Sequence, residues 1–445
     1  MNERNILQLI DEKKYVQLKK ELEDMNEVDI AEILDPLDAN TALLIFRMLP
    51  KDLAVDVFAH FSSEQQRDIV NAVTDKELNF IMDELFFDDM IDLIEEMPAN
   101  IVNKILMNST QEERKLINQF LKYPADSAGS LMTIEYVELS KGMSVKNSIA
   151  HIKEIGLNKE TIYTCYVLAK NRTLEGIVSL RNLVVSQEEV LVVDIMEDEA
   201  IFVHTHDDQE TVANVFRKYG FLALPVVDKE KRLTGIITVD DIMDVMEQEA
   251  TEDFQLMAAM APSEDAYLDT SVFDLAKQRI VWLLILMIVA TFSGSIITKF
   301  ADVLQSAVIL ATFMPMLMNT GGNAGSQSST LIIRGLATGE ITLKDGWKVL
   351  WKEFRVSFLV AISLSIINFI RLLTLEKVGI PMALTVSITL IGTITIAKMA
   401  GGLLPLLAKK LKIDPAIMAG PLISTAVDAV TLTVYFTIAK ILLKL

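Results

Sequence analysis

The chain has 445 residues and a formal net charge of −20 at pH 7, but residues 1–277 hold 54 acids and 26 bases whereas residues 278–445 hold seven acids and 15 bases. A net charge of −28 on the first part repels nucleic acid and attracts cations, and the single cysteine, Cys165, excludes an intramolecular disulfide. An acidic part joined to an apolar, mildly basic part indicates a cytosolic sensor on a membrane protein, although the charge would serve solubility equally well.

Residues 1–130 are predicted to form an acidic, all-helical N-terminal domain. Glycine is absent before Gly129, and short amphipathic blocks recur about every 12 to 13 residues. Each block starts with a capping residue or a proline, a pattern that predicts a right-handed superhelix of short helices. The blocks at residues 83–96 are crowded with acids, which indicates either a solvated face or a face that binds a metal ion or a partner.

Residues 131–193 and 194–246 contain a duplicated β-α-β-β-α unit. The copies end in similar sequences, LEGIVSLRNLV at 174–184 and LTGIITVDDIM at 233–243, and β-branched runs predict their strands. These features resemble the CBS domain pair, a regulatory α/β module. In such modules the last two polar positions of the ending can hold an adenosine ribose, which would make Thr238 and Asp241 candidate nucleotide ligands. The first copy has Asn182 at the second of these positions, which weakens a nucleotide site there.

A long acidic helix is predicted from Asp240 to about Ala261, because this stretch lacks glycine and proline and carries an apolar side. We assign residues 247–275 to a connecting helix and linker between the regulatory part and the membrane part. Anionic lipid should repel an acidic helix next to a membrane, so cations are expected to sit on it.

Residues 276–445 are predicted to form an all-α transmembrane domain with five spans, at about 280–298, 305–333, 356–373, 381–407 and 415–440. The second and fourth spans contain proline and paired glycines, which indicates broken or tilted helices. With the N-terminus inside, ten Lys and Arg flank the inner ends of the spans and five flank the outer ends. The positive-inside rule therefore predicts a multi-pass protein with a cytoplasmic N-terminus and an external C-terminus.

Asp428 is the only acid within the five predicted spans, and a carboxylate at this depth costs at least about 2.5 kcal/mol on insertion scales. Helical spacing places it on one face with Gly420, Ser424, Thr431 and Tyr435, a stripe typical of the wall of a wet pore. The alternative interpretation is a structural Asp that accepts hydrogen bonds from a neighbouring helix.

The stretch MPMLMNTGGNAGSQSST at 314–330 is rich in small and amide residues and is predicted to form a second wall of the pore. Amide oxygens suit a hydrated ion, and glycines permit close approach of helices or exposed carbonyls. The alternative is a tightly packed helix crossing without a pore. The expected pore-lining residues are Asn319, Gly321, Asn323, Gly325, Gln327 and Gly420.

The order of these parts resembles the MgtE family of magnesium channels, and the resemblance covers essentially the whole chain. DSAGSLM at 126–132, PMLMNTGGNAGSQ at 315–327 and IDPAIMAGPL at 413–422 are similar to signatures of that family. The resemblance implies a homodimer in the cell inner membrane, with ten spans around one axial pore and the two connecting helices acting as a plug.

The resemblance also implies which residues bind metal. Asp428 matches the pore aspartate with the Ser424 carbonyl next to it, and Asp414 would pair with the plug helix. The implied cytosolic magnesium ligands are Asp88, Asp92, Gly129, Asp241, Asp244, Glu249, Glu252 and Asp253, with Asp56 and Glu210 as weaker matches. Gly220 departs from the family, whose members can carry an acid at that position.

The sequence therefore predicts a channel that imports hydrated Mg²⁺ and is shut by Mg²⁺ bound between the N-terminal domain, the CBS pair and the plug helix. Mg²⁺ is expected as both transported and regulatory ion, ATP as a candidate ligand, and lipid, divalent cations and a second copy as partners, without nucleic acid. The alternatives are an ion-coupled divalent-cation carrier or exporter, and a nucleotide-sensing membrane regulator without transport. An enzyme is not expected, because we find no nucleophile–base set, Walker A loop or metal-hydrolase spacing.

Overall fold

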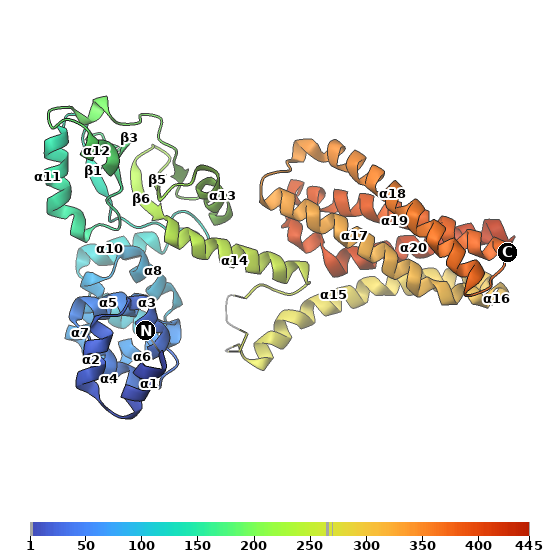
Figure 1. The fold of residues 1–445 in the computed structure, drawn as a ribbon, viewed down its shortest axis with the longest axis horizontal. Coiled ribbons are helices and arrows are strands. Elements are labelled where there is room, and N and C mark those ends of the chain that lie inside the picture. Colours follow the sequence, from blue (N-terminus) through green and yellow to red (C-terminus); the bar gives the residue numbers. More distant parts are fainter. Residues whose placement is uncertain (1–2, 264–266, 269, 445) are drawn as a thin grey trace. The chain divides into compact units, whose positions relative to one another are not determined.

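The computed structural model describes residues 3–263, 267–268 and 270–444, and the chain divides into two compact units, Met1–Val245 and Met246–Leu445 (Figure 1). The first unit contains the helical N-terminal domain and the two α/β repeats. The second contains the end of the connecting helix and the long apolar helices. Each unit is described by itself.

Ten short helices build the N-terminal domain, as the repeating amphipathic blocks predict. Side chains of Asn26, Asp38, Ser62, Thr74 and Thr110 cap five of them. Alternate helices pack against each other, α3 on α5, α5 on α7 and α4 on α6, which is the pairing of a superhelix of short helices. Its handedness stays a prediction. The helices are α1 (Glu3–Asp11), α2 (Tyr15–Glu23), α3 (Glu27–Leu34), α4 (Ala39–Phe46), α5 (Lys51–Ala59), α6 (Ser63–Ala72), α7 (Asp75–Glu84), α8 (Phe87–Glu96), α9 (Ala99–Asn108) and α10 (Gln111–Phe120).

The duplicated unit forms two similar three-stranded sheets. In each sheet the first strand runs parallel to the second, and the third is antiparallel to the second. The first copy contains β1 (Val137–Leu139), α11 (Val145–Ile155), η1 (Gly156–Asn158), β2 (Thr164–Leu168), β3 (Leu174–Ser179), α12 (Leu180–Val185) and η2 (Val192–Asp194). The second contains β4 (Val203–His204), α13 (Gln209–Tyr219), β5 (Ala223–Val227) and β6 (Leu233–Thr238).

The glycine in the ending of each copy has a packing reason. A Cβ on Gly235 would lie 2.5 Å from the Thr133 carbonyl oxygen, and a Cβ on Gly176 would lie 2.5 Å from that of Glu197. Both neighbours form isolated bridges to the third strands, Thr133 with Ile236 and Glu197 with Ile177. Each glycine therefore admits the backbone of the segment that starts a repeat.

The connecting helix is α14 (Val239–Met257), close to the range predicted for it. The helix ends before Ala259, which has a positive φ of 56°. Acids dominate its exposed side, whereas Ile242, Val245 and Leu256 are buried.

The membrane half consists of α15 (Val272–Lys299), α16 (Ala301–Ser306), η3 (Val308–Phe313), α17 (Met314–Ala337), η4 (Leu343–Asp345), α18 (Gly346–Thr374), α19 (Ile380–Lys410), η5 (Pro415–Met418) and α20 (Gly420–Leu443) (Figure 1). Within the described residues, four helices are long and apolar enough to cross a membrane: Val272–Lys299, Leu343–Thr374, Ile380–Lys410 and Pro415–Leu443. The second predicted span, 305–333, starts instead as the end of α16 and a 3-10 turn before α17 begins.

Helix α17 packs extensively against both α19 and α20, and α18 packs against α19. Helix α17 has 24 residues, enough to cross a membrane, but its many small and amide residues lower its mean hydropathy. For this reason it is not among the four helices identified as spans. The most polar helix of the bundle is thus packed against α19 and against α20, the helix that carries Ser424 and Asp428.

Candidate functional site

Glycines on one face of α17 allow this helix to pack closely against α19 and α20. A Cβ on Gly401 of α19 would lie only 2.3 Å from the Gly325 carbonyl oxygen, so the two backbones are in direct contact. A Cβ on Gly321 would lie 2.6 Å from a Thr393 methyl carbon. Gly321 and Gly325 are buried in these contacts, so within one protomer they allow close packing and do not border an open surface.

A second face of α17 carries a stripe of exposed amides, which we call the amide stripe: Asn319, Asn323 and Gln327. Asn323 Nδ2 donates a hydrogen bond to Asn319 Oδ1 at 3.2 Å. The three residues are spaced by four, so they lie one above another along the helix. Exposed amides in the middle of a membrane helix are costly in contact with lipid, which indicates that this face meets water or another protein surface.

Asp428 lies on α20, in the segment of that helix that packs against α17. Ser424, one turn earlier, is within 3.0 Å of a Cβ built on Gly322, and its Oγ lies 3.5 Å from Ser326 Oγ. Gly321 meets Val427 and Thr431, whereas Gly325 meets Ile423, so α17 and α20 run antiparallel and Asp428 falls near the level of Gly321. Asp428 is half-buried, and its carboxylate has no hydrogen-bond or ion-pair partner among the residues that the structure describes.

The remainder of the predicted stripe on α20 faces the protein interior. Tyr435 is fully buried and its hydroxyl donates to the Leu310 carbonyl oxygen at 3.0 Å. Thr431 is also buried, next to Gly321. The helical period places Thr431 and Tyr435 on the same face as Asp428. Packing of α17 and η3 covers the C-terminal part of this face. Gly420, Ser424 and Asp428, in the N-terminal part of the stripe, are half-buried.

The end of the connecting helix packs on the start of α20. A Cβ on Gly420, whose φ is +42°, would lie 2.6 Å from the Met257 carbonyl oxygen. Leu256 joins a small apolar cluster with Ile333, Ala416 and Ala419. Gly420, expected to line a pore, thus lies where the C-terminal end of α14 approaches the membrane bundle.

Carboxylates meet at this junction. Burial raises the pKa of Asp253 to about 6, and the nearby charges of Asp414 and Glu249 add to the effect. Asp414 Oδ1 accepts a hydrogen bond from the Ala416 amide at 2.7 Å, which caps η5. Glu252 is exposed on the same helix. When no cation is bound between them, the negative charges of Asp253, Asp414 and Glu249 repel one another.

A second group of carboxylates lies in the N-terminal unit, and we call it the acidic cluster: Asp88, Asp89, Glu160 and Asp241. Burial and then the charge of Asp241 raise the pKa of Asp88 to about 9. Burial raises the pKa of Glu160 to about 8 and that of Asp89 to about 6, in both cases with Asp241 as the next contributor. Asp88 is 8% exposed, and its Oδ1 has no hydrogen-bond partner within the described part of the chain.

Burial also raises the pKa of Asp241, although its Oδ2 accepts a hydrogen bond from Thr238 Oγ1 at 2.6 Å. The acidic cluster joins α8, the loop after η1 and the first turn of α14, which are far apart in the sequence. One buried and three half-buried carboxylates favour the neutral acid unless a cation joins them. The unpartnered oxygen of Asp88 and the all-oxygen donor set fit a hard divalent cation such as Mg²⁺.

The other residues expected to bind metal are dispersed. Asp92, Asp56 and Asp244 are exposed on α8, α5 and α14, and Glu210 is exposed in the first turn of α13. The Gly129 amide donates to the Thr205 carbonyl oxygen at 3.0 Å. Among the described residues, no three His, Cys, Asp or Glu side chains form a preformed metal site. A loosely held, mostly hydrated ion fits this arrangement better than a fully coordinated one.

A cavity of about 580 Å³ opens between the two α/β repeats. Tyr163, Ser179 and Arg181 supply polar groups, and Phe221 and Pro225 supply apolar walls. Neither Thr238 nor Asp241, the nucleotide ligands expected from sequence, is among the residues that line it. Asp241 belongs to the acidic cluster, where a phosphate would be repelled. The cavity has the size and mixed lining of a small-ligand site.

Sequence reasoning missed a buried polar network inside the membrane half. Ser328 Oγ of α17 donates to Glu353 Oε2 of α18 at 2.6 Å, and Lys398 Nζ of α19 donates to Ser328 Oγ at 3.3 Å and Gln327 Oε1 at 3.5 Å. Glu353 and Lys398 are 8% and 5% exposed. The predicted third span began at residue 356, which left Glu353 outside it, whereas α18 begins at Gly346 and buries this acid. Lys398, a lone base within the predicted fourth span, is the signal that could have found the network.

Comparison with known proteins gives matches along the whole chain. Family models described as "MgtE intracellular N domain", "CBS domain" and "Divalent cation transporter" match residues 25–126, 192–248 and 314–438. The Magnesium transporter MgtE of Thermus thermophilus is 35% identical over 434 residues, which cover 96% of this chain and 95% of that protein. The Magnesium transporter MgtE of Bacillus subtilis is 33% identical and covers 92% of this chain and 93% of that protein.

Two solved structures resemble the N-terminal half. The cytosolic domain of the Mg²⁺ channel MgtE in complex with ATP is 32% identical, with a TM-score of 0.52, and covers 55% of this chain and 100% of its own. The soluble part of a magnesium transporter is 29% identical, with a TM-score of 0.52, and covers 56% of this chain and 98% of its own.

Proposed function

The chain belongs to the MgtE family of magnesium transporters, and from this premise we propose that it is a channel that imports hydrated Mg²⁺ and is shut by cytosolic Mg²⁺. The observation that carries the proposal is the carboxylate of Asp428, which has no protein partner among the described residues and lies on the helix that packs against α17, the helix with the exposed amide stripe. A carboxylate in a membrane helix needs water and a passing cation, or a polar group of a second copy of the chain, to stabilise its charge.

The pore is proposed to form between two copies of the chain. The amide stripe would be exposed to lipid in a single protomer, and a two-fold partner would cover it while leaving a polar passage. Two Asp428 carboxylates would then face one axis with the amide oxygens of Asn319 and Asn323. In this arrangement α17 is the fifth span, and each protomer sits in the cell inner membrane with its N-terminus in the cytoplasm and its C-terminus outside.

Mg²⁺ dehydrates reluctantly and usually keeps several waters when proteins bind it. A passage with one carboxylate per protomer and neutral amides suits such an ion, because these groups can accept hydrogen bonds from its water shell. Selectivity would come from fit to the hydrated ion.

Closure is proposed to depend on Mg²⁺ bound to the two carboxylate groups. In the acidic cluster, Mg²⁺ would neutralise Asp88, Asp89, Glu160 and Asp241 and so hold the N-terminal domain to the α/β repeats. At the end of α14, Mg²⁺ between Asp253 and Asp414 would hold this helix, the proposed plug, against the start of α20. Without the ion, like charges repel, so Mg²⁺ favours the closed state by binding it more tightly.

Flux into liposomes tests the proposed pore. Asp428→Asn should reduce Mg²⁺ entry by at least about tenfold, since loss of one carboxylate per protomer removes the charge that attracts the hydrated ion into the pore. Asp302→Asn is the matched control, because Asp302 is an exposed acid of α16 away from the stripe. Equal flux through wild type and Asp428→Asn would refute the pore. Single-channel recording separates the alternative, since an ion-coupled carrier shows no unitary conductance steps.

Regulation by ATP is a second proposal, favoured by the cavity between the repeats. A relative's cytosolic domain was solved in complex with ATP, and the cavity of this chain supplies Tyr163 and Phe221 for a base and Arg181 for phosphate. The proposed nucleotide site is therefore this cavity, in place of Thr238 and Asp241.

A further inference from the structure

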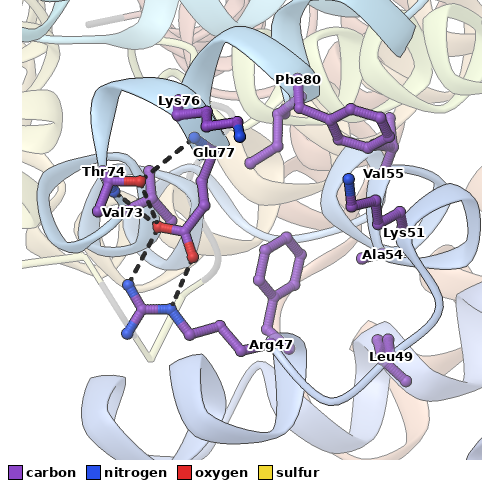
Figure 2. Close-up of a pocket in the computed structure, with 12 residues that line it drawn as sticks. Arg47, Leu49, Lys51, Ala54, Val55, Val73, Thr74, Lys76, Glu77 and Phe80 are labelled. Atoms are coloured by element: carbon purple, nitrogen blue, oxygen red, sulfur yellow. Dashed lines mark hydrogen bonds and ion pairs between the residues drawn. The ribbon is translucent and has the colours of Figure 1, made fainter.

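A separate cavity of about 540 Å³ lies within the N-terminal domain and is lined by none of the carboxylates named above (Figure 2). It is formed by the end of α4, the turn into α5, the first turns of α5 and the N-terminal half of α7. No step of Mg²⁺ transport or gating proposed above uses it. Its volume is within the usual range for pockets that hold small organic ligands.

The floor of this cavity is apolar and well ordered by packing. Its buried members come from three helices and two turns: Phe46, Leu49, Ala54, Val55, Val73 and Ile81. Phe80 adds a half-buried aromatic ring at the side. An apolar floor of this size favours a ligand with a ring or a short hydrocarbon body, because burying that body removes its surface from water.

The rim is basic in a strongly acidic protein. Residues 1–130 contain 27 acids and only 13 bases, yet three of these bases, Arg47, Lys51 and Lys76, line this one cavity. Glu77 is the only acid that lines it. The rim thus carries two more positive than negative charges. Charge of this sign at one point of an acidic surface predicts an anionic ligand.

The single acid of the rim is already satisfied. Glu77 accepts two hydrogen bonds from the Arg47 guanidinium, at 3.1 and 3.2 Å, and two from Thr74, at 2.8 and 2.9 Å (Figure 2). The Thr74 and Arg47 bonds lower the pKa of Glu77 below its ordinary value. Its charge is therefore fixed and neutralised by Arg47, which leaves the two lysines as the unbalanced charges.

Both lysines are available for a ligand. Lys51 Nζ lies 4.7 Å from the centroid of the Phe80 ring, and neither Lys51 nor Lys76 forms an ion pair with any described residue. Figure 2 shows the Lys51 and Lys76 side chains on two sides of Phe80. In addition, α5 starts after Pro50 without a side-chain cap, so its first backbone N–H groups can donate hydrogen bonds to an anion at the same rim.

We propose that this cavity is a binding site for a small organic anion, a carboxylate attached to an aromatic ring or a short hydrocarbon body. The ring fills the apolar floor beside Phe80, and the carboxylate lies between Lys51 and Lys76. A nucleotide fits less well, because Arg47, the rim's bidentate phosphate binder, is already engaged by Glu77. An acidic peptide would need an open groove longer than this cavity, so the compact anion is the occupant that the shape and charge favour.

Ligand-observed fluorine NMR tests the proposal on the full-length chain in lipid nanodiscs. The probe is 4-(trifluoromethyl)benzoate, and 4-(trifluoromethyl)benzyl alcohol is its uncharged match. Wild type should broaden the benzoate signal with a dissociation constant of about 1 mM or below, and the alcohol should bind at least about tenfold more weakly. Empty nanodiscs measure partition of both compounds into lipid.

Three variants decide the outcome. Lys51→Gln with Lys76→Gln should weaken benzoate binding at least about tenfold, since two charges are lost. Lys115→Gln with Lys122→Gln, exposed lysines of the same domain, should leave it unchanged. Ala54→Phe should fill the floor of the cavity and abolish binding although both lysines are present. If Ala54→Phe fails to fold, the two double-lysine variants still decide the outcome. Equal binding of the alcohol, undiminished binding after loss of Lys51 and Lys76, or no binding to wild type would each overturn the proposal.

Discussion

Replacing Asp88 by Asn is the sharpest probe of the acidic cluster. Asn has the size of Asp and keeps its hydrogen-bonding oxygen, but it removes the charge that Asp241, Asp89 and Glu160 oppose. The cluster destabilises the fold when its members ionise without a cation. The variant should therefore make the N-terminal unit more stable at neutral pH when Mg²⁺ is absent.

The sign and size follow from the pKa of Asp88, which burial raises from 3.8 to about 9. Unfolded Asp ionises above about pH 4, whereas folded Asp88 holds its proton until about pH 9, so the unfolded state gains stability as pH rises between these values. At pH 7 the difference amounts to about 4 kcal/mol at most, at 1.36 kcal/mol per pH unit. Part of this cost is shared with Glu160 and Asp89, whose raised pKa values belong to the same cluster.

The assay is thermal unfolding of the full chain in nanodiscs, followed by circular dichroism from about pH 5 to about pH 8.5. In wild type without Mg²⁺, the Tm of the N-terminal unit should fall as pH rises, and added Mg²⁺ should restore it by binding the ionised cluster. Asp88→Asn should flatten the pH dependence and reduce the gain from Mg²⁺. Asp83→Asn, an exposed acid on α7, is the control and should behave as wild type.

Two results would refute this reasoning. If Asp88→Asn has the same pH slope as wild type, Asp88 is not held neutral by its surroundings. If the slope disappears but Mg²⁺ stabilises both proteins equally, the cluster is buried as described but is not where Mg²⁺ acts.

Further predictions concern the membrane half and the cavity between the repeats. Glu353→Gln or Lys398→Met alone should destabilise the bundle by about 1–3 kcal/mol in thermal unfolding in detergent, because each removes one end of the hydrogen-bonded bridge through Ser328 and leaves a buried charge at the other end. The double variant should recover most of the loss. Additive losses in the double variant would show that the two charges do not interact. Gly401→Ala should cost about 1–3 kcal/mol, since its Cβ would meet the Gly325 carbonyl oxygen at 2.3 Å, whereas Gly294→Ala, with open space around its Cβ, should cost almost nothing. Arg181→Gln should weaken ATP binding by about tenfold in equilibrium dialysis with radiolabelled nucleotide, whereas Thr238→Val should not, and the reverse result would return the site to Thr238 and Asp241.

The parts of the fold that sequence predicts well are those where one local signal is repeated. Capping residues and helical spacing predict the ten short helices, and the similar endings at 174–184 and 233–243 predict the two sheets. These patterns act within about a dozen residues, so they can be read without knowledge of packing. The glycine of each ending is also explained, since Gly176 and Gly235 each face a backbone oxygen.

The acidic cluster shows why the candidate site was predicted only in part. Asp88 and Asp241 were expected as metal ligands on the strength of a family resemblance. Asp89 and Glu160 were not, because their importance depends on the fold bringing α8, the loop after η1 and α14 together. No spacing within one segment reveals such a meeting of three segments.

Helical period alone also misplaces half of the stripe on α20. Asp428 and Tyr435 are seven residues apart and share a face, yet Tyr435 is buried against Leu310 while Asp428 is only half-buried. Contacts with α17 and η3 bury Thr431 and Tyr435 at one end of the stripe and leave Asp428 half-buried. Which end is covered depends on helix packing, which the period does not contain.

The two carboxylates inside the membrane half differ in a way that bears on transport. Glu353 is buried, accepts a hydrogen bond from Ser328, and shares that hydroxyl with the Lys398 ammonium, so its charge is offset within the protomer. Asp428 has no such partner among the described residues and is half-buried. A charge that its own protomer offsets can hold helices together but has little attraction left for an ion. Only a carboxylate without an internal partner retains that attraction, and this physical difference, more than the presence of an acid in a span, singles out Asp428.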